Sequence, residues 1–191
     1  LTQLIEAFVC TRANPMTDAL CREGIGRVSH ALQRAYQQDG DRGAREDMAL
    51  ASLLGGLALA NAGLGAAHGF AGPLGGLFDA PHGTVCAALL PNVMAANVQA
   101  LQERLPASAS LQKYHETARL VTGRANATAT DGVAWVQQLC ETLRIPPLRH
   151  FGVAPRDFDV LAERASAASS MKPNPISLTP GELESILAES L

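Results

Sequence analysis

A chain of 191 residues is long enough to bury one sizeable core, so we expect a single domain over residues 1–191. Hydrophobic residues make up 47% of the chain, charged residues make up 17%, and the formal net charge is only -3. This balance supports a buried core but gives no electrostatic field strong enough to recruit nucleic acid, so no nucleic-acid partner is expected.

Four cysteines, Cys10, Cys21, Cys86 and Cys140, are scattered without any CxxC spacing, mostly among small and aliphatic residues. This usage favours buried free thiols of a reducing cytoplasm. The apolar passages are broken by Gly, Asn, His or Pro before they reach the roughly 20 residues of a membrane span, and no secretory leader opens the chain. We therefore predict a cytoplasmic protein without membrane segments.

The composition predicts an all-α fold, because aromatic residues are only 4% and Ala, Leu, Glu, Gln and Arg dominate. The opening LTQLIEAFVC follows helical spacing from residue 1, so we expect the chain to begin inside a helix of a larger protein. Asn14-Pro15 can open a helix that runs to about Gln38, before Asp39-Gly40 ends it.

A second long helix is predicted from about Arg42 to Asn61, where MALASLLGGLALA is apolar nearly all round. Such a helix is expected to be central rather than superficial. Pro81 suits the first residue of a helix that ends near Leu101, which places His82 in its first turn. The glycines between these helices allow close approach of neighbouring backbones, and they are Gly63, Gly65, Gly69, Gly72, Gly75 and Gly76.

Amphipathic segments follow at about 108–122, 130–144 and 155–169, with Ile145-Pro146-Pro147 as a connector between the last two. The run MKPNPISLTP holds three prolines in ten residues and is predicted to be extended. Thr179 and Glu182 then form a capping-box signature that opens a last helix.

Two of the five histidines, His68 and His82, lie fourteen residues apart in the least charged part of the chain. An imidazole without a partner is costly to bury, so each needs a metal or a hydrogen bond. Two histidines from separate helices can meet at Fe, Zn or Ni if the glycine-rich segment folds back. Metal ligands and hydrogen-bonded core histidines therefore remain the two interpretations, whereas His30, His115 and His150 lie in polar surroundings that favour structural roles.

Further ligands are scarce near this pair. Asp79 lies in a predicted loop, where a capping or turn role is expected, and Gln3 is a poor ligand because its amide is neutral. Glu6, one turn further along the same helix face, is the only nearby carboxylate that could help. The glycine run matches neither nucleotide-binding pattern, which leaves close helix packing or backbone amides that line a substrate pocket. No nucleophile lies on a recognisable elbow, so a catalytic triad is not predicted.

The passage NAGLGAAHGFAGPLGGLFDAPHGTVCAALLPNVMAAN, residues 61–97, resembles the signature of the iron-containing alcohol dehydrogenases. That group includes the maleylacetate reductases and is related to dehydroquinate synthase and glycerol dehydrogenase. AGLG, a histidine, PLGG, PHG, LLP and a closing Asn occur in order, and LTQLIEAF is similar to the family's DALTHxIE cut two residues in. With Asn174-Pro175, the resemblance covers essentially the whole chain.

The resemblance implies that residues 1–191 form the family's helical C-terminal domain, which binds metal and substrate. It also implies an N-terminal α/β domain, absent from this chain, that binds NAD(P), with the metal in the cleft between the two domains. A chain without that domain is expected to be inactive. Homo-oligomers are expected because the family commonly forms them.

The family's metal ligands are an Asp, a His four residues later and two further histidines. By position, His68 and His82 match the last two, which makes them the expected metal ligands and catalytic residues. The Asp falls before Leu1, and Gln3 occupies the place of the other histidine, which makes it the third expected metal ligand, through an amide oxygen that binds more weakly than imidazole. Gly72 stands where many members carry a histidine near the nicotinamide and substrate, so it is the expected cofactor-binding position.

The function implied is hydride transfer between NAD(P) and a small alcohol, aldehyde or keto acid, with Fe(II) or Zn(II) polarising the substrate oxygen. Gln3 keeps a metal-independent, maleylacetate reductase-like enzyme open, in which His68 and His82 donate hydrogen bonds to the substrate. The departures at Gln3 and Gly72 also keep open a non-catalytic helical module for binding or oligomerisation.

Overall fold

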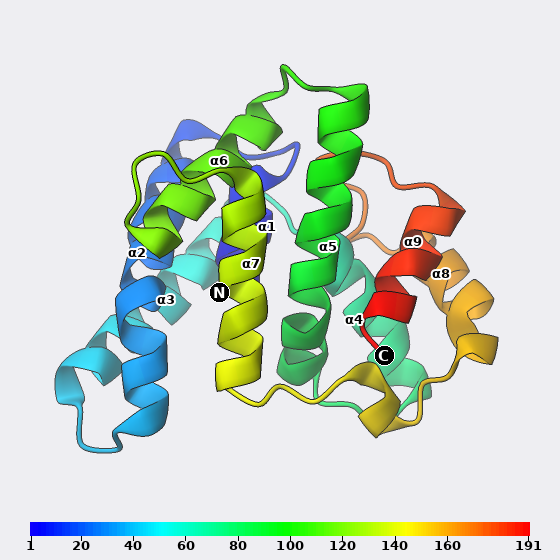
Figure 1. Cartoon of the computed structure of the whole chain (residues 1–191), viewed down its shortest axis with the longest axis horizontal. Helices are drawn as coiled ribbons and strands as arrows, with labels where there is room; N and C mark the ends of the chain where they lie inside the picture. The colour runs from blue at the N-terminus through cyan, green and yellow to red at the C-terminus, as the bar shows by residue number, and fades with distance from the viewer.

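The computed structural model describes residues 1–191 as nine α-helices and two short 3-10 helices, without a β-strand (Figure 1). The prediction of an all-α fold is confirmed. The helices are α1 (Thr2–Val9), α2 (Pro15–Gln37), α3 (Arg42–Asn61), α4 (Ala66–Leu77), α5 (His82–Arg104), α6 (Ala109–Thr122), α7 (Ala129–Thr142), α8 (Phe158–Ala167) and α9 (Pro180–Glu189), with the 3-10 helices η1 (Leu148–Phe151) and η2 (Pro155–Asp157) between α7 and α8.

Local capping fixes the start of several helices where the sequence predicts them. The Asn14 side chain accepts hydrogen bonds from the backbone N–H groups of Met16 and Thr17, and Pro15 follows it as the first helical residue of α2. At α9, the Thr179 N–H donates to Glu182 Oε2 over 2.6 Å, and Thr179 Oγ1 accepts from the Glu182 N–H. The N-termini of α2 and α9 are therefore both capped by residues that are close to them in sequence.

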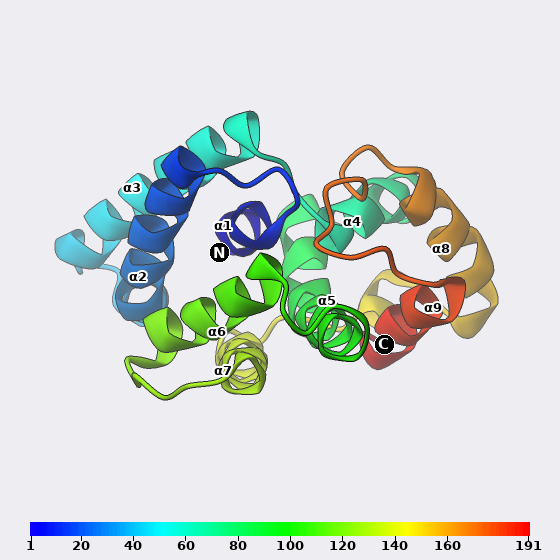
Figure 2. The same ribbon diagram turned by 90° about the horizontal axis from the view of Figure 1, so that it is seen from above.

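Two hydrophobic cores meet at α5, which lies between the two halves of the molecule in Figure 2. Leu90, Met94 and Leu101 face the core shared with α1, α2, α3, α6 and α7. Val85 and Leu89 face the core shared with α4, α8 and α9. The helix is long and apolar enough to cross a membrane, but 61% of its most apolar stretch is buried inside the protein, as in a core helix.

Helix α1 is enclosed by other helices and is seen nearly end-on in Figure 2. Residues Leu4 to Val9 are all buried, and Phe8 is fully covered, with Arg22 and Lys113 each 5.1 Å from its ring centroid. The helix has no side-chain cap, so its packing against α2, α3, α5 and α6 determines its structure. Gly24 of α2 allows close approach, because a Cβ there would lie 2.6 Å from Leu4 Cδ2.

The prediction that residues 42–61 form a central helix is wrong in its placement. Helix α3 lies at the edge of the molecule, with Leu53 and Leu57 exposed by 59% and 44%. Only the face that carries Ala51, Leu54 and Ala58 packs inward, against α1 and α2. An apolar composition does not say which helix is central, and α5 takes that place because both of its faces carry large buried side chains.

The glycine-rich segment forms a helix that the sequence analysis did not assign. Helix α4 includes Gly69, Gly72 and an internal Pro73, residues that disfavour helix in isolation. Seven of its twelve residues are nevertheless buried, and tertiary packing overrides the local preference. The 171–180 run also differs from the uniformly extended prediction, because the N–H groups of Met171 and Asn174 close turns onto Ala168 O and Met171 O.

Two glycines of α2 provide a matched test of this packing. We expect Gly24→Ala to destabilise the protein by about 1–3 kcal/mol, because its Cβ would overlap the buried Leu4. Gly26→Ala, two residues away with nothing within 4 Å of its Cβ, should instead stabilise by up to about 1 kcal/mol. Thermal unfolding followed by circular dichroism measures both, and equal stabilisation by the two alanines would refute the close packing of α1 on α2.

Candidate metal centre

The N-terminus of α4 is capped by side chains from two distant segments. Its N-cap residue, Gly65, has no side chain to satisfy the free N–H groups of the first turn. The Ala66 N–H donates to Asn174 Oδ1 over 3.1 Å, and the Ala67 N–H donates to Glu6 Oε1 of α1 over 2.7 Å. The negative carboxylate also lies at the positive end of the helix dipole, where it is favourable.

Glu6 also orients His68. The Nδ1–H of His68 donates to Glu6 Oε2 over 2.6 Å, and the two side chains are only 7% and 4% exposed. Because an ionised carboxylate only accepts hydrogen bonds, this contact places the proton of a neutral imidazole on Nδ1, and that tautomer has its lone pair on Nε2. The bond therefore fixes both the orientation and the tautomer of the imidazole.

Glycine is required at position 65 by the same two acceptors. A Cβ on Gly65 would lie 2.8 Å from Asn174 Oδ1 and 2.9 Å from Glu6 Oε1. Neither oxygen can move away without losing its hydrogen bond to α4. The glycine before the first histidine thus permits the close approach of α1 and the 171–180 segment to the start of α4.

Asn174 extends this arrangement into a buried polar network. Its Nδ2 donates to Asn97 Oδ1 over 2.7 Å and to the Ile176 carbonyl over 2.8 Å, and Asn97 Nδ2 donates to the Tyr114 hydroxyl over 3.1 Å. Burial raises the pKa of Tyr114 well above its usual range, so its hydroxyl stays protonated. The network ties α5 and α6 to the segment that caps α4.

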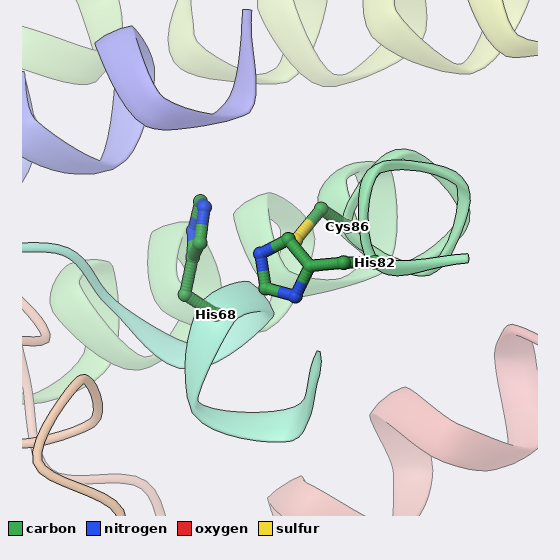
Figure 3. Close-up of side chains that lie close together, drawn as sticks. All are labelled: His68, His82 and Cys86. Atoms are coloured by element: carbon green, nitrogen blue, oxygen red, sulfur yellow. The ribbon is translucent and has the colours of Figure 1, made fainter. Parts of the chain in front are cut away.

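The structure brings His82 and Cys86 to His68. His82 is exposed at the start of α5, one helical turn before the buried Cys86, and its Nε2 lies 3.6 Å from Cys86 Sγ. The His68 and His82 ring centroids are 5.5 Å apart, with the rings tilted by 54°. Figure 3 shows the three side chains on two helices, close together. One possible ligand atom from each residue lies within 4.8 Å of the other two.

In the absence of a bound cation, burial and a nearby negative charge keep the Cys86 thiol protonated and unreactive. Burial raises the pKa of Cys86 to about 12, and the negative charge of Glu6 contributes in the same direction. The thiol is therefore protonated near neutral pH in the metal-free protein.

The predicted site residues fall into two groups. His68 and His82 meet, as the fourteen-residue spacing suggested. Gln3 packs against α3, with its Oε1 3.4 Å from where a Cβ on Gly55 would stand, and no hydrogen bond joins it to the histidines. Its role as a ligand stays a prediction. Gly72 is exposed and has open space around it, so its role near a cofactor also stays a prediction.

Other polar residues have roles outside the cluster. Asp79 is exposed and provides no side-chain cap to α5, but it lies at the centre of a tight turn that the Ala80 N–H closes onto the Phe78 carbonyl over 2.8 Å, so of the expected capping or turn role the structure shows the turn. His115 is structural, because its Nδ1 accepts a hydrogen bond from the Ala129 N–H at the start of α7.

Glu6 is predicted only as a possible ligand, whereas the structure makes it the partner of His68. Cys86, which the structure brings beside the two histidines, is not among the residues predicted from the sequence, although its spacing of four residues from His82 is a usable signal.

Comparison with known proteins identifies the family that this chain resembles. The sequence profile of the Fe-containing alcohol dehydrogenase family, C-terminal region, matches residues 1–191. Alcohol dehydrogenase 4 of Saccharomyces cerevisiae is 35% identical over 191 residues, which cover 100% of this chain and 48% of that protein. The 1,3-propanediol dehydrogenase of Klebsiella pneumoniae is 37% identical over 177 residues, or 92% of this chain and 44% of that protein.

The fold is also that of a solved relative. A crystal structure of 1,3-propanediol oxidoreductase superposes with a TM-score of 0.90 at 33% identity, over 100% of this chain and 49% of that one. The chain thus spans about half the length of the relatives it matches.

The hydrogen bonds of the buried Asn174 amide predict that its removal strongly destabilises the fold. We expect Asn174→Ala to lower the free energy of unfolding by about 2–4 kcal/mol, because it leaves buried groups on Ala66 and Asn97 without partners. Asn92→Ala removes a single half-buried hydrogen bond to Ser190 Oγ and should cost about 1 kcal/mol. Chemical denaturation measures both, and similar losses for the two variants would contradict a special role of Asn174.

Proposed function

The chain belongs to the Fe-containing alcohol dehydrogenase family, whose C-terminal region it matches, and from this we propose that the full-length protein transfers hydride between NAD(P) and a small alcohol or aldehyde. Residues 1–191 would act as its metal- and substrate-binding domain. The observation that carries the proposal is the meeting of His68 and His82, with His68 held by the buried Glu6. The names of the relatives support the substrate class.

The cluster fits a divalent metal ion. His68 is oriented by a carboxylate so that Nε2 carries a lone pair, which is the outer-shell arrangement usual for a metal-binding histidine. His82 lies beside it, and no lysine or arginine forms an ion pair with Glu6. His68 and His82 would hold Fe(II) or Zn(II), which when bound would serve as a Lewis acid toward the substrate oxygen.

The open side of the cluster fits a small substrate. His82 is exposed, and Gly72, one turn after His68 on α4, has nothing within 4 Å of the position of a Cβ. The glycine leaves room for a substrate or a nicotinamide ring near the two imidazoles. At Nδ1, the ring of His68 is held by the buried Glu6, which keeps its orientation fixed.

The nicotinamide cofactor would come from another part of the protein. This chain has no strand and no glycine-rich dinucleotide motif, and it spans about half of its relatives. We propose an N-terminal α/β domain as its partner, docked so that the nicotinamide faces His82. The chain by itself would then be inactive, whereas the full-length protein would be active.

Activity of the full-length protein tests this function. We expect NAD(P)-dependent oxidation of a small primary alcohol, and a loss of about 100-fold or more in kcat/KM for His82→Ala. His30→Ala, which changes an exposed histidine of α2, should have no effect. Absence of nicotinamide turnover with alcohols and aldehydes would favour a non-catalytic module. Activity unchanged after exhaustive chelation would favour a metal-free reductase that uses the imidazoles as hydrogen-bond donors.

The role of Glu6 predicts a loss of metal affinity. In Glu6→Gln the amide oxygen can still accept from the Ala67 N–H, but the amide nitrogen would face His68 Nδ1 and reverse the tautomer. The lone pair would move away from the cluster, and we expect metal affinity to fall by about 10–100-fold.

Chelator competition on the full-length protein measures this affinity. Glu103→Gln is the matched control, because Glu103 is exposed on α5 and bonds only Gln99. Equal affinities of the two variants would show that the Glu6 carboxylate does not orient a metal ligand.

A further inference from the structure

We propose that Cys86 is a third protein ligand of the metal held by His68 and His82, and that its sulfur makes Zn(II) the preferred ion. The inference rests on the metal site of the proposed function and extends it. In this cluster, one ligand atom from each of the three residues lies within 4.8 Å of the other two. Nothing else in the chain adds a Cys, His, Asp or Glu to this group.

The separation of the sulfur and the nitrogen agrees with shared coordination. In tetrahedral zinc sites the Zn–S bond is about 2.3 Å and the Zn–N bond about 2.0–2.1 Å, so bound sulfur and nitrogen lie about 3.6 Å apart. Cys86 Sγ and His82 Nε2 lie 3.6 Å apart. The pair therefore has the spacing of two ligands of one ion without further movement.

Helix geometry produces this spacing. Residues four apart lie on one face of a helix, as in metal sites where two ligands follow each other by one turn. Cys86 is held by the core around α4, α8 and α9, whereas His82 is exposed in the first turn of α5. The exposed ring of His82 can turn toward His68, with which it shares the cluster, while Cys86 stays in place.

The donor set of this chain lacks the imidazole expected at position 3. Gln3 offers only a neutral amide and packs against Gly55 of α3. A cysteine sulfur supplies a negative charge and a soft ligand from a different helix. On binding, the S–H bond of Cys86 is replaced by a sulfur–metal bond and the proton passes to water, with no oxidation or reduction. Thiolate favours Zn(II) over Fe(II), which prefers harder ligands.

A competing explanation for the short contact is a hydrogen bond between Cys86 and His82 that only orients the imidazole. Cobalt(II) distinguishes the two, because thiolate coordination gives an intense charge-transfer band in the near ultraviolet that imidazole ligands do not give. The metal-free full-length protein is titrated with Co(II) and its absorption recorded for the wild type, Cys86→Ser and Cys86→Ala. Cys140→Ser is the control, since Cys140 bonds the Ala87 carbonyl and lies outside the cluster.

The expected result is a band that saturates at one Co(II) per chain, persists in Cys140→Ser and is absent from both Cys86 variants. Circular dichroism that matches the wild type excludes loss of folding as the cause. Stoichiometric Co(II) binding that depends on His82 but shows no thiolate band would overturn the role of Cys86 and leave the proposed function intact. No binding of Co(II) or Zn(II) at all would overturn the metal site, while alcohol oxidation by the same sample would still support the dehydrogenase.

A competition between ions tests the selectivity separately. The wild type and Cys86→Ser are equilibrated anaerobically with equal concentrations of Zn(II) and Fe(II), and the bound metals are quantified by mass spectrometry. We expect the wild type to hold mainly Zn(II), with the ratio of Zn to Fe falling by about tenfold or more in Cys86→Ser. An unchanged ratio would show that the sulfur does not set the metal preference.

Discussion

The site depends on the hydrogen bonds of the Glu6 carboxylate, because this one buried charge both caps the start of α4 and orients the imidazole of His68. One oxygen accepts from the Ala67 N–H at the start of α4, and the other accepts from His68 Nδ1. A buried carboxylate without such donors would be strongly unfavourable. The donors exist only if α1 lies against the start of α4, so the position of the imidazole and the packing of α1 are determined together.

The central helix, α5, supplies His82, the second histidine of the site. Because α5 belongs to both cores, its first turn is anchored through Cys86 and Leu89 while His82 remains exposed. The two imidazoles therefore differ: His68 is fixed by a hydrogen bond inside the protein, and His82 is free to adjust. Such a division suits a site that must hold one ligand in place while its open side accommodates a substrate.

The sequence predicts the local features of this fold better than its long-range features. Asn14 and Thr179 open helices through residues within a few positions, and this information is present in the sequence. Helix α4 lacks such a local signal, because its first turn is capped by Glu6 and Asn174, which are distant in sequence. The edge position of α3 was missed for the same reason, since an apolar pattern does not identify the partner that covers it.

The sequence predicts the site residues whose chemistry and spacing agree, as for His68 and His82. It does not predict residues whose role depends on a partner that is distant in sequence. Glu6 looked like a weak ligand in the sequence, because only the folded chain shows that its oxygens are already used by α4 and His68. Cys86 resembles the other buried cysteines in the sequence, and only its spacing of four residues from His82 sets it apart. The affinity of a site for a metal ion depends on the type and geometry of the donor atoms, and not on the order of the ligand residues in the sequence. Under the proposed coordination by Cys86, a donor on α5 would take the place of the imidazole that the family resemblance expects at position 3, while the signature around the histidines stays recognisable.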